Sequence, residues 1–341
     1  MIGRALVVPR ERGEEVRRQL REAGLLRRDL AIRREGGFLA FPLVEGRPVP
    51  DGWGDLSERE FAPVPTASAG DYREQVDVAP EERSLLPRSF DVVGDIVLVR
   101  VPRELEHRAT EIGRALLEFV PGARLVGNDR GVRGAERVRS LERIAGSGDW
   151  ATRHRENGLD LDVDLGRAYF SPRLAREHAR VAAEVERGDH VYDLCCGVGP
   201  FALTIARDGR AVEVTAVDSN PEALALLRSS SARLRFRTPV RAVEAPVELF
   251  TASAEPVHRV ILNLPREGIK YLPSVARTVA RRGRLYYYEV TPRAETERRG
   301  EEVTRILDAP QCWTVVDRHV VHPYSPQADL VAYTLERSAG S

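Results

Sequence analysis

The alternation of hydrophobic and polar positions divides the chain into stretches of different period. Near the start, ALVVP and GGFLAFPLV predict short strands on either side of a helix in ERGEEVRRQLREAGLL. In that helix Val16, Leu20 and Leu25 form an approximate apolar face, as amphipathic helices do. We therefore expect a small α+β module over residues 1–50.

The following stretch, 51–85, loses this periodicity and is rich in proline, glycine and acidic residues, which favours a linker. The pattern resumes with a strand in SFDVVGDIVLVRVP and a helix in ELEHRATEIGRALLEFV. An arginine-rich strand pair in RLVGNDRGVRGAERVRSLERIAG and the alternating run ENGLDLDVDLGRAYF follow. These segments predict a middle α/β domain over residues 86–165.

From residue 166 onwards, strands and helices alternate. DHVYDLCC, EVTAVD, HRVILNLP and GRLYYYEV are predicted strands, with helices starting near Gly199 and Pro221. The segment CWTVVDRHVVHPYSPQADLVAYTLE predicts a closing hairpin. Alternating units of this length predict a mostly parallel sheet with helices on both faces. The expected fold class is thus α/β, with a Rossmann-like domain over residues 166–341.

The composition is that of a soluble globular protein, with 42% hydrophobic and 30% charged residues. No apolar run has membrane-spanning length, and the first residues become charged too early for a signal peptide. Cys195 and Cys196 are neighbours and Cys312 is remote, so neither a disulfide framework nor a metal site is predicted. We expect a cytoplasmic protein without membrane contact.

The formal net charge of zero hides local clusters of arginine. Residues 1–35 contain ten Arg and six acidic residues, and residues 121–145 contain six Arg and three acidic residues. Arginine binds phosphate groups bidentately and stacks on bases, so this clustering favours a nucleic-acid partner. The near absence of lysine carries no such meaning, since a GC-rich genome would also produce it.

A glycine-containing turn, Asp193-Leu-Cys-Cys-Gly197-Val-Gly199-Pro-Phe201, joins the first strand of the last domain to a helix. Gly197 permits a tight turn, and Gly199 would let a ligand approach the backbone. Asp218 ends the next strand, where a carboxylate can bind ribose hydroxyls. The pattern also satisfies a loose dinucleotide fingerprint, so NAD is one candidate cofactor.

Three features favour S-adenosylmethionine over NAD. Asp193 precedes the glycines by four positions, where it can bind the methionine ammonium group. A polar motif, Asn263-Leu-Pro265, follows the predicted strand HRVILNLP. The closing hairpin is typical of class I methyltransferases.

The stretch YFSPRLAREHARV immediately precedes this turn and contains Arg173 and Glu177, four residues apart. On a helix both side chains would project from one face. They could form a solvated ion pair, or they could be the acid–base end of an active site. The residues alone leave both interpretations open.

These motifs, taken in order, resemble the archaeal and eukaryotic type of tRNA (guanine-37-N1)-methyltransferase. The stretch VVPRERGEEVRRQLREAGLLRRDLAIRREGGFLAFPL is similar to that family's small tRNA-binding domain. SFDVVGDIVLV, GAERVRSLERIAG, HRENG, YFSPRLAREH, DLCCGVGPFA, VDSNPEA, LNLP and YYYEV are similar to its later signatures. The resemblance implies binding to the anticodon loop and outer corner of tRNA. An enzyme that clamps one tRNA with a tethered module could act as a monomer, which is the state we expect.

The resemblance also implies roles for individual residues. Guanine N1 carries a proton at neutral pH, so its methylation needs a base and a donor for charge on O6. Glu177 matches the family's base and Arg137 its O6-stabilising arginine. Tyr169 and Arg173 match residues around the guanine and phosphate, and Asn263 and Pro265 match the loop that frames the base.

For the cofactor, the turn and the resemblance together select a set of residues, and two of its positions depart from the family pattern. Glu244-Ala245 stands where the family usually has Asp-Ala, and His178 replaces an arginine thought to contact the methionine carboxylate. The expected cofactor-binding residues are Asp193, Gly197, Gly199, Phe201, Asp218, Ser219, Glu244, Ala245, Asn263 and His178.

Two other functions are weighed against methylation. The wybutosine-pathway enzyme that transfers an aminocarboxypropyl group shares the fold and cofactor, but its relatives carry Gly-Asn where this chain has Pro172-Arg173. A non-catalytic tRNA-binding protein is the alternative from another class, and the intact Asp193, Asn263 and Glu177 argue against it.

Overall fold

The structure is a computed structural model that describes residues 2–27, 30–50, 52–62, 71–134, 136–307 and 312–339. The chain divides into two compact units. The first comprises Met1–Asp77 with Phe119–Pro121, and the second comprises Val78–Glu118 with Gly122–Ser341. Among the described residues, every helix is too short or too polar to span a lipid bilayer.

The first unit is a four-stranded antiparallel sheet of order β2-β3-β1-β4 with one α-helix. Leu6, Val16, Leu20 and Phe41 are fully buried between them, which confirms two residues of the predicted apolar face. The third, Leu25, is buried but lies beyond the helix, which ends at Glu22. The elements are β1 (Ile2–Pro9), η1 (Arg10–Arg12), α1 (Gly13–Glu22), β2 (Arg33–Glu35), β3 (Phe38–Pro42), β4 (Asp55–Glu60) and η2 (Tyr72–Gln75).

Strand β4 corrects the prediction of a linker over residues 51–85. It pairs antiparallel with β1, from Ile2 opposite Glu60 to Val7 opposite Asp55, and the next residue, Phe61, is buried. Because β4 is an edge strand, its acidic side chains remain in water and only its backbone joins the sheet. Composition therefore gave no strand signal here. Residues 63–70 of the predicted linker lie outside the described residues.

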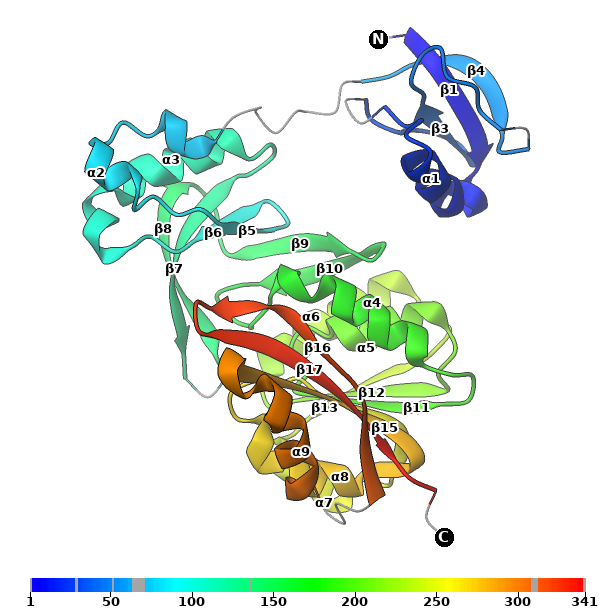
Figure 1. Cartoon of the computed structure of the whole chain (residues 1–341), viewed down its shortest axis with the longest axis vertical. Helices are drawn as coiled ribbons and strands as arrows, with labels where there is room; N and C mark the ends of the chain where they lie inside the picture. The colour runs from blue at the N-terminus through cyan, green and yellow to red at the C-terminus, as the bar shows by residue number, and fades with distance from the viewer. Residues whose placement is uncertain are drawn as a thin grey trace. The chain divides into compact units, whose positions relative to one another are not determined.

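The second unit begins with a smaller sheet of order β5-β6-β7-β8 and a separate β9-β10 hairpin (Figure 1). The arginine-rich segment forms the β7–β8 pair, as predicted. The elements are α2 (Pro80–Arg83), β5 (Phe90–Val93), β6 (Ile96–Val99), η3 (Arg103–Arg108), α3 (Ala109–Phe119), β7 (Leu125–Arg133), β8 (Val138–Gly146), β9 (Ala151–Glu156) and β10 (Leu159–Asp164).

A seven-stranded sheet of order β13-β12-β11-β14-β15-β17-β16 follows, in which β17 is antiparallel to β15 and β16 and the other neighbouring pairs are parallel. This confirms the Rossmann-like prediction and the closing hairpin. The elements are η4 (Pro172–Leu174), α4 (Ala175–Glu184), β11 (His190–Leu194), α5 (Pro200–Asp208), β12 (Glu213–Asp218), α6 (Pro221–Leu234), β13 (Val240–Glu244), α7 (Val247–Ser253), β14 (Val257–Leu262), η5 (Gly268–Tyr271), α8 (Leu272–Arg277), β15 (Val279–Pro292), η6 (Arg293–Glu295), α9 (Thr296–Ile306), β16 (Trp313–Ser325) and β17 (Ala328–Arg337).

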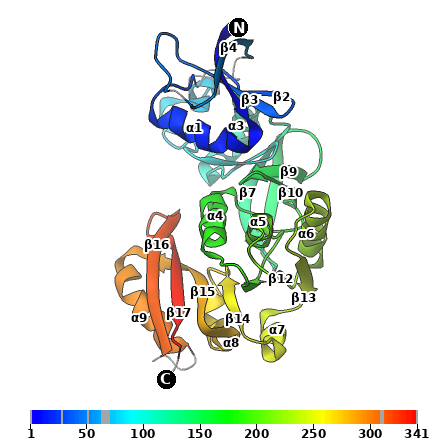
Figure 2. The same ribbon diagram turned by 90° about the vertical axis from the view of Figure 1, so that its right-hand side faces the viewer.

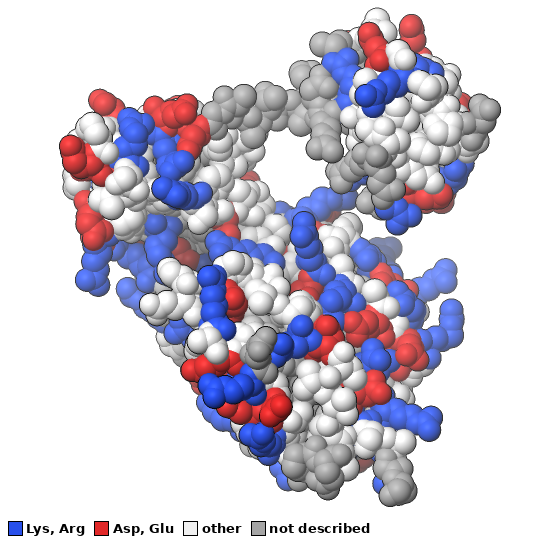
Figure 3. All heavy atoms as spheres, in the orientation of Figure 1, with Lys and Arg blue, Asp and Glu red and all other residues white. Residues whose placement is uncertain are grey.

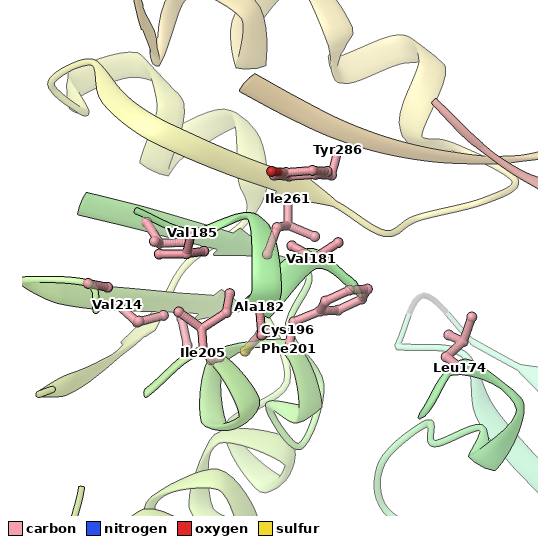
Figure 4. Packing of buried hydrophobic residues seen from close by; sticks show 14 of the residues in the cluster. Leu174, Val181, Ala182, Val185, Cys196, Phe201, Ile205, Val214, Ile261 and Tyr286 are labelled. Carbon is pink, nitrogen blue, oxygen red and sulfur yellow. The ribbon is translucent and has the colours of Figure 1, made fainter. Parts of the chain in front are cut away.

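Helices cover both faces of this sheet, with α4, α5 and α6 on one side and α7, α8 and α9 on the other (Figures 1 and 2). Each face of the sheet packs a hydrophobic core against its helices. In the core on the α4 side, Val181 and Ala182 of α4 lie beside Ile261 and Tyr286 of the sheet (Figure 4). Tyr287, between two tyrosines of that core, points into the other one. The carboxyl ends of β11, β12, β13 and β14 consequently meet at one edge, where α/β sheets bind their ligands.

Candidate active site

The turn after β11 has the tight backbone that its glycines predict. Cys195, Gly197 and Gly199 all have positive φ angles of 62°, 56° and 80°. A Cβ at Gly199 would lie 2.4 Å from a methyl carbon of Leu227, so this glycine permits close packing against α6. The atoms nearest to Gly199 on this side belong to Leu227, so close packing explains the glycine without a ligand. Cys195, Cys196 and Cys312 are free cysteines.

Two carboxylates stand at the ends of adjacent strands. Asp218 accepts hydrogen bonds from the backbone N–H of Gly197 (2.7 Å) and of Asn220 (2.9 Å), and burial raises its pKa. Glu244 lies opposite Asp218 in the β12–β13 register and is exposed, and Ala245 donates its N–H to the Asp218 carbonyl. Ser219 is exposed. The predicted ribose and adenine positions thus adjoin one another.

Asp193 is fully buried at the end of β11. Its Oδ2 accepts a hydrogen bond from the Ala202 N–H (3.1 Å), whereas its Oδ1 has no partner among the described residues. Burial in this apolar site raises the pKa of Asp193 to about 8, helped by the charge of Asp218.

His178 and Asn263 also carry buried, unpartnered atoms. His178 Nδ1 lies 2.7 Å from Glu156 Oε1 and its ring packs edge-on against Phe201, but its Nε2 has no partner among the described residues. The same holds for Oδ1 of Asn263. Buried polar atoms are nearly always hydrogen-bonded. With Asp193 Oδ1, these atoms fit a ligand that offers an ammonium and a carboxylate group, as the methionine part of S-adenosylmethionine does.

Glu177 is buried, with 4% of its surface exposed, and its carboxylate contacts three side chains. Oε1 accepts hydrogen bonds from Arg180 Nε (2.9 Å) and Nη2 (2.6 Å) and from the Tyr288 hydroxyl (2.8 Å). Oε2 lies 3.1 Å from Nε2 of His319. Burial raises the pKa of Glu177, but Arg180, Tyr288 and His319 together outweigh burial, so the pKa is lowered.

Arg173 does not lie beside Glu177. It belongs to the 3-10 turn η4, before α4 begins, and its Nε donates to Asp91 Oδ1 at 2.7 Å. The helical four-residue spacing therefore does not apply. A solvated Arg173–Glu177 ion pair is excluded, since the partner of Glu177 is Arg180.

Tyr169 links the turn to the arginine-rich strand pair. Its carbonyl oxygen is the nearest atom to a Cβ built on Gly197, at 3.4 Å, and its ring lies under Arg137 (5.7 Å) and Arg139 (5.3 Å). Arg139 is also held by Asp129 and donates to the Phe170 carbonyl. Arg137 has no ion pair within the described part of the chain. Its guanidinium therefore remains available to a ligand.

The loop Asn263-Leu264-Pro265 is fixed to β15, because the Pro265 carbonyl accepts the Val290 N–H at 2.9 Å. Phe201 packs against Tyr288 with ring centres 5.6 Å apart. Asp193, Asp218, Glu244 and Asn263 thus lie at or just beyond the carboxyl ends of neighbouring strands of the sheet. A cavity of about 460 Å³ elsewhere, under α7, is lined by Ala245 but by no other predicted residue.

Sequence reasoning missed Arg180, Tyr288 and His319 as partners of Glu177. Arg180 could have been found, since it follows Glu177 by three helical positions. Tyr288 and His319 lie 111 and 142 residues further along the chain, so no local pattern connects them to Glu177. No group of three or more His, Cys, Asp or Glu residues in the described ranges is arranged to hold a metal ion.

Comparisons with known proteins match most of the chain. Residues 152–316 match the TRM5/TYW2 methyltransferase domain, residues 74–149 the TYW2 N-terminal domain, and residues 5–50 the tRNA methyltransferase 5 N-terminal domain. The chain is 34% identical over 331 residues to the tRNA (guanine(37)-N(1))-methyltransferase Trm5b of Pyrococcus abyssi, covering 95% of this chain and 96% of the relative.

Two solved structures extend this similarity to the fold. The crystal structure of Trm5b from Pyrococcus abyssi superposes with a TM-score of 0.70 at 32% identity, covering 98% of this chain and 99% of the other. A complex of aTrm5 with tRNALeu gives a TM-score of 0.68 at 28% identity and covers 98% and 99%.

Proposed function

Because the chain belongs to the tRNA (guanine-37-N1)-methyltransferase family, and so to enzymes that depend on S-adenosylmethionine, we propose that Glu177 is its general base. The observation that carries this proposal is the asymmetry of the Glu177 carboxylate. Oε1 is occupied by Arg180 and Tyr288, whereas Oε2 has a single neighbour, His319, among the described residues. One oxygen orients the group and the other can accept a proton.

The reaction transfers a methyl group to N1 of guanosine 37, and S-adenosylmethionine supplies that methyl on a positively charged sulfur. Glu177 is ionised at neutral pH, because its pKa is lowered, and it can therefore take the N1 proton. A positioned base of this kind accelerates a reaction by about 10²–10⁴-fold. Guanosine 37 must leave its stack to reach a buried carboxylate, which costs a few kcal/mol.

Arg137 is the proposed donor to guanine O6. Its guanidinium lies over the Tyr169 ring, beside the turn that carries Gly197, and it has no ion pair in the described ranges. Arg139, its neighbour on the same ring, is already engaged by Asp129 and is the less suitable donor. We also propose that Asn263 and Pro265 frame the guanine base. Arg173, which is held by Asp91, would contribute to the environment of the guanine and its phosphate.

Cofactor binding is assigned to the carboxyl edge of the sheet. Asp193 and His178 would bind the ammonium and carboxylate of the methionine part, because each has a buried unpartnered atom. Asp218, with Ser219, would bind the ribose, and Glu244 with Ala245 would adjoin the adenine. The glycine turn and Phe201 shape the floor of this site.

We propose that the N-terminal unit binds the outer corner of tRNA while the second unit binds the anticodon loop of the same molecule, with the enzyme acting as a monomer. The arginine-rich composition of the N-terminal unit supports its assignment to the outer corner of tRNA. Figure 3 shows basic residues on one face of the molecule, interspersed with acidic residues. Deletion of residues 1–62, which removes β4 together with its partner β1, should weaken tRNA binding. Unchanged affinity and unchanged methylation would contradict this assignment.

The reaction itself is tested with unmodified tRNA carrying G37, cofactor labelled in its methyl group, and mass spectrometry of the nucleosides. We expect 1-methylguanosine at position 37 and no product from tRNA with A37. A mass gain corresponding to an aminocarboxypropyl group would instead identify the wybutosine-pathway reaction. Cofactor binding without any modified nucleoside would identify a non-catalytic tRNA-binding protein.

A further inference from the structure

His319 extends the environment of Glu177 towards solvent. Its Nε2 lies 3.1 Å from Glu177 Oε2, and its Nδ1 lies 2.8 Å from Asp317 Oδ2. The exposed fraction of the side chains rises along this row, from 5% for Glu177 to 32% for His319 and 49% for Asp317. The three groups thus form a hydrogen-bonded path from a buried carboxylate to water.

A bulge in β16 places His319 on this face of the sheet. Val315 lies opposite Leu335, but Asp317 lies opposite Thr334, so Val316 is an extra residue. Without it, position 319 would oppose Val331, whose side chain packs in the core on the α9 side. With it, His319 opposes Ala332, which faces the α4 side. Bulges commonly redirect side chains in this way.

Ala332 completes the alignment. It lies opposite Tyr288 on β15 and opposite His319 on β16, so Tyr288 and His319 stand on the same face, one strand apart on either side of β17. Both reach Glu177 from the sheet, and they contact different oxygens of its carboxylate. Burial and Glu177 raise the pKa of Tyr288, so it can only donate its proton, whereas an imidazole can also accept one.

We propose that His319 relays the proton from Glu177 to solvent and that Asp317 fixes the ring in the required tautomer. This proposal rests on the role of Glu177 as the base. Methylation forms the N1–C bond and breaks the N1–H bond, and the electron pair of the broken C–S bond stays on sulfur. The N1 proton passes to Glu177 Oε2 and then to His319 Nε2. As His319 Nε2 accepts this proton, Nδ1 releases its own proton to Asp317, from which it leaves to water, and exchange with water then restores the starting tautomer of the ring.

The relay removes a charge imbalance at the base. Protonation of Glu177 would leave Arg180 without a full countercharge, although Glu184 also contacts it at 2.5 Å. Since Glu177 is buried, its proton cannot leave directly to bulk water. A neutral imidazole on Oε2 provides the exit. His319 is a positioning and relay residue here, because it acts through Glu177.

The test is the single-turnover rate of methylation at saturating tRNA and cofactor for His319→Ala, His319→Gln and Asp317→Asn. We expect His319→Ala to be slower by about 10²-fold, the lower end of the range for a positioned acid–base group. Added imidazole should restore part of this rate. His319→Gln should be as slow as His319→Ala, because glutamine can donate a hydrogen bond but cannot carry the proton. Asp317→Asn should have a smaller effect.

His322→Ala is the matched control, since His322 is a half-buried histidine on the same strand that contacts the Pro323 carbonyl. It should leave the rate unchanged. An unchanged rate in His319→Ala would overturn the relay. So would a slow His319→Ala that imidazole does not rescue, together with a wild-type rate in His319→Gln. If the wild type forms no 1-methylguanosine, or if Glu177→Gln keeps the wild-type rate, the proposed function fails instead.

Discussion

The regions around Glu177 on α4 and around Asp193 at the end of β11 present the same chemical group in two environments. Both carboxylates are almost fully buried. The pKa of Glu177 is lowered, whereas the pKa of Asp193 is raised to about 8. Burial favours the neutral acid in both cases, so the difference comes from their partners.

Glu177 has the cation Arg180 and the Tyr288 hydroxyl on one oxygen, whereas the one hydrogen-bond donor to Asp193 among the described residues is the Ala202 N–H. Charged donors offset desolvation, and a single amide does not. Glu177 is therefore ionised at neutral pH, whereas the Asp193 carboxyl is mostly protonated there. The comparison teaches that the partners of a buried carboxylate decide which chemistry it performs.

The largest expected effect is on the rate of methylation in Glu177→Gln. The amide cannot accept the N1 proton, so the single-turnover rate should fall by about 10²–10⁴-fold while cofactor and tRNA still bind. Glu184→Gln is the matched control, because Glu184 shares Arg180 on the same helix but is not the proposed base. Equal losses in the two variants would show that the Arg180 ion pairs, not the base, limit the reaction.

The second effect is on cofactor affinity in Asp193→Asn. Loss of a charged hydrogen-bond partner is worth about 1.5–3 kcal/mol, so calorimetry should show binding of S-adenosylmethionine about 10–100-fold weaker. Asp189→Asn serves as a control, since Asp189 is a buried aspartate that pairs with Arg259 just before β11. Unaltered affinity in Asp193→Asn would remove Asp193 from the cofactor site.

Cofactor binding should also release protons through Asp193. With a pKa of about 8, its carboxyl group is mostly protonated at pH 7, and an ammonium group would favour the ionised form. Binding enthalpies measured at pH 7 in buffers of different ionisation enthalpy should indicate release of close to one proton. Asp193→Asn should release almost none. Enthalpies that do not depend on the buffer would contradict the raised pKa.

The smallest effect is on stability, where the two carboxylates should act with opposite sign. The raised pKa of Asp193 means that its contribution to the free energy of unfolding falls as the pH rises from about 4 to about 8. Asp193→Asn should therefore gain stability relative to the wild type over this range. The lowered pKa of Glu177 gives a contribution that is present at neutral pH and lost in acid.

Thermal unfolding between pH 4 and pH 8 measures both contributions. The melting temperature of Asp193→Asn should rise by a few degrees relative to the wild type as the pH increases. The deficit of Glu177→Gln should be largest near neutral pH and should shrink below about pH 4.5. If the melting temperatures of the two variants changed with pH in the same way, the neighbours of Glu177 and Asp193 would not be what sets their pKa values apart.

The order of strands and helices was predictable because each element carries its own periodicity. β11, β12, β14 and the closing hairpin follow the predicted segments, and parallel connection then brings their carboxyl ends to one edge. Strand β4 was not predictable, since its polar side chains stay in water. It is held by backbone hydrogen bonds to β1, which lies far away in the sequence. Arg173 was misplaced because α4 begins two residues after it.

The sequence by itself determined the local elements, the glycine turn and the presence of Glu177 at the start of a helix beside it. Only the tertiary structure decided what that glutamate can do. Its charge state depends on burial and on Arg180 of the same helix. It depends also on Tyr288 and His319, which reach it from β15 and β16, and on one extra residue in β16 that turns His319 to this face. A pKa responds to groups within a few ångströms in space, however far apart they lie along the chain.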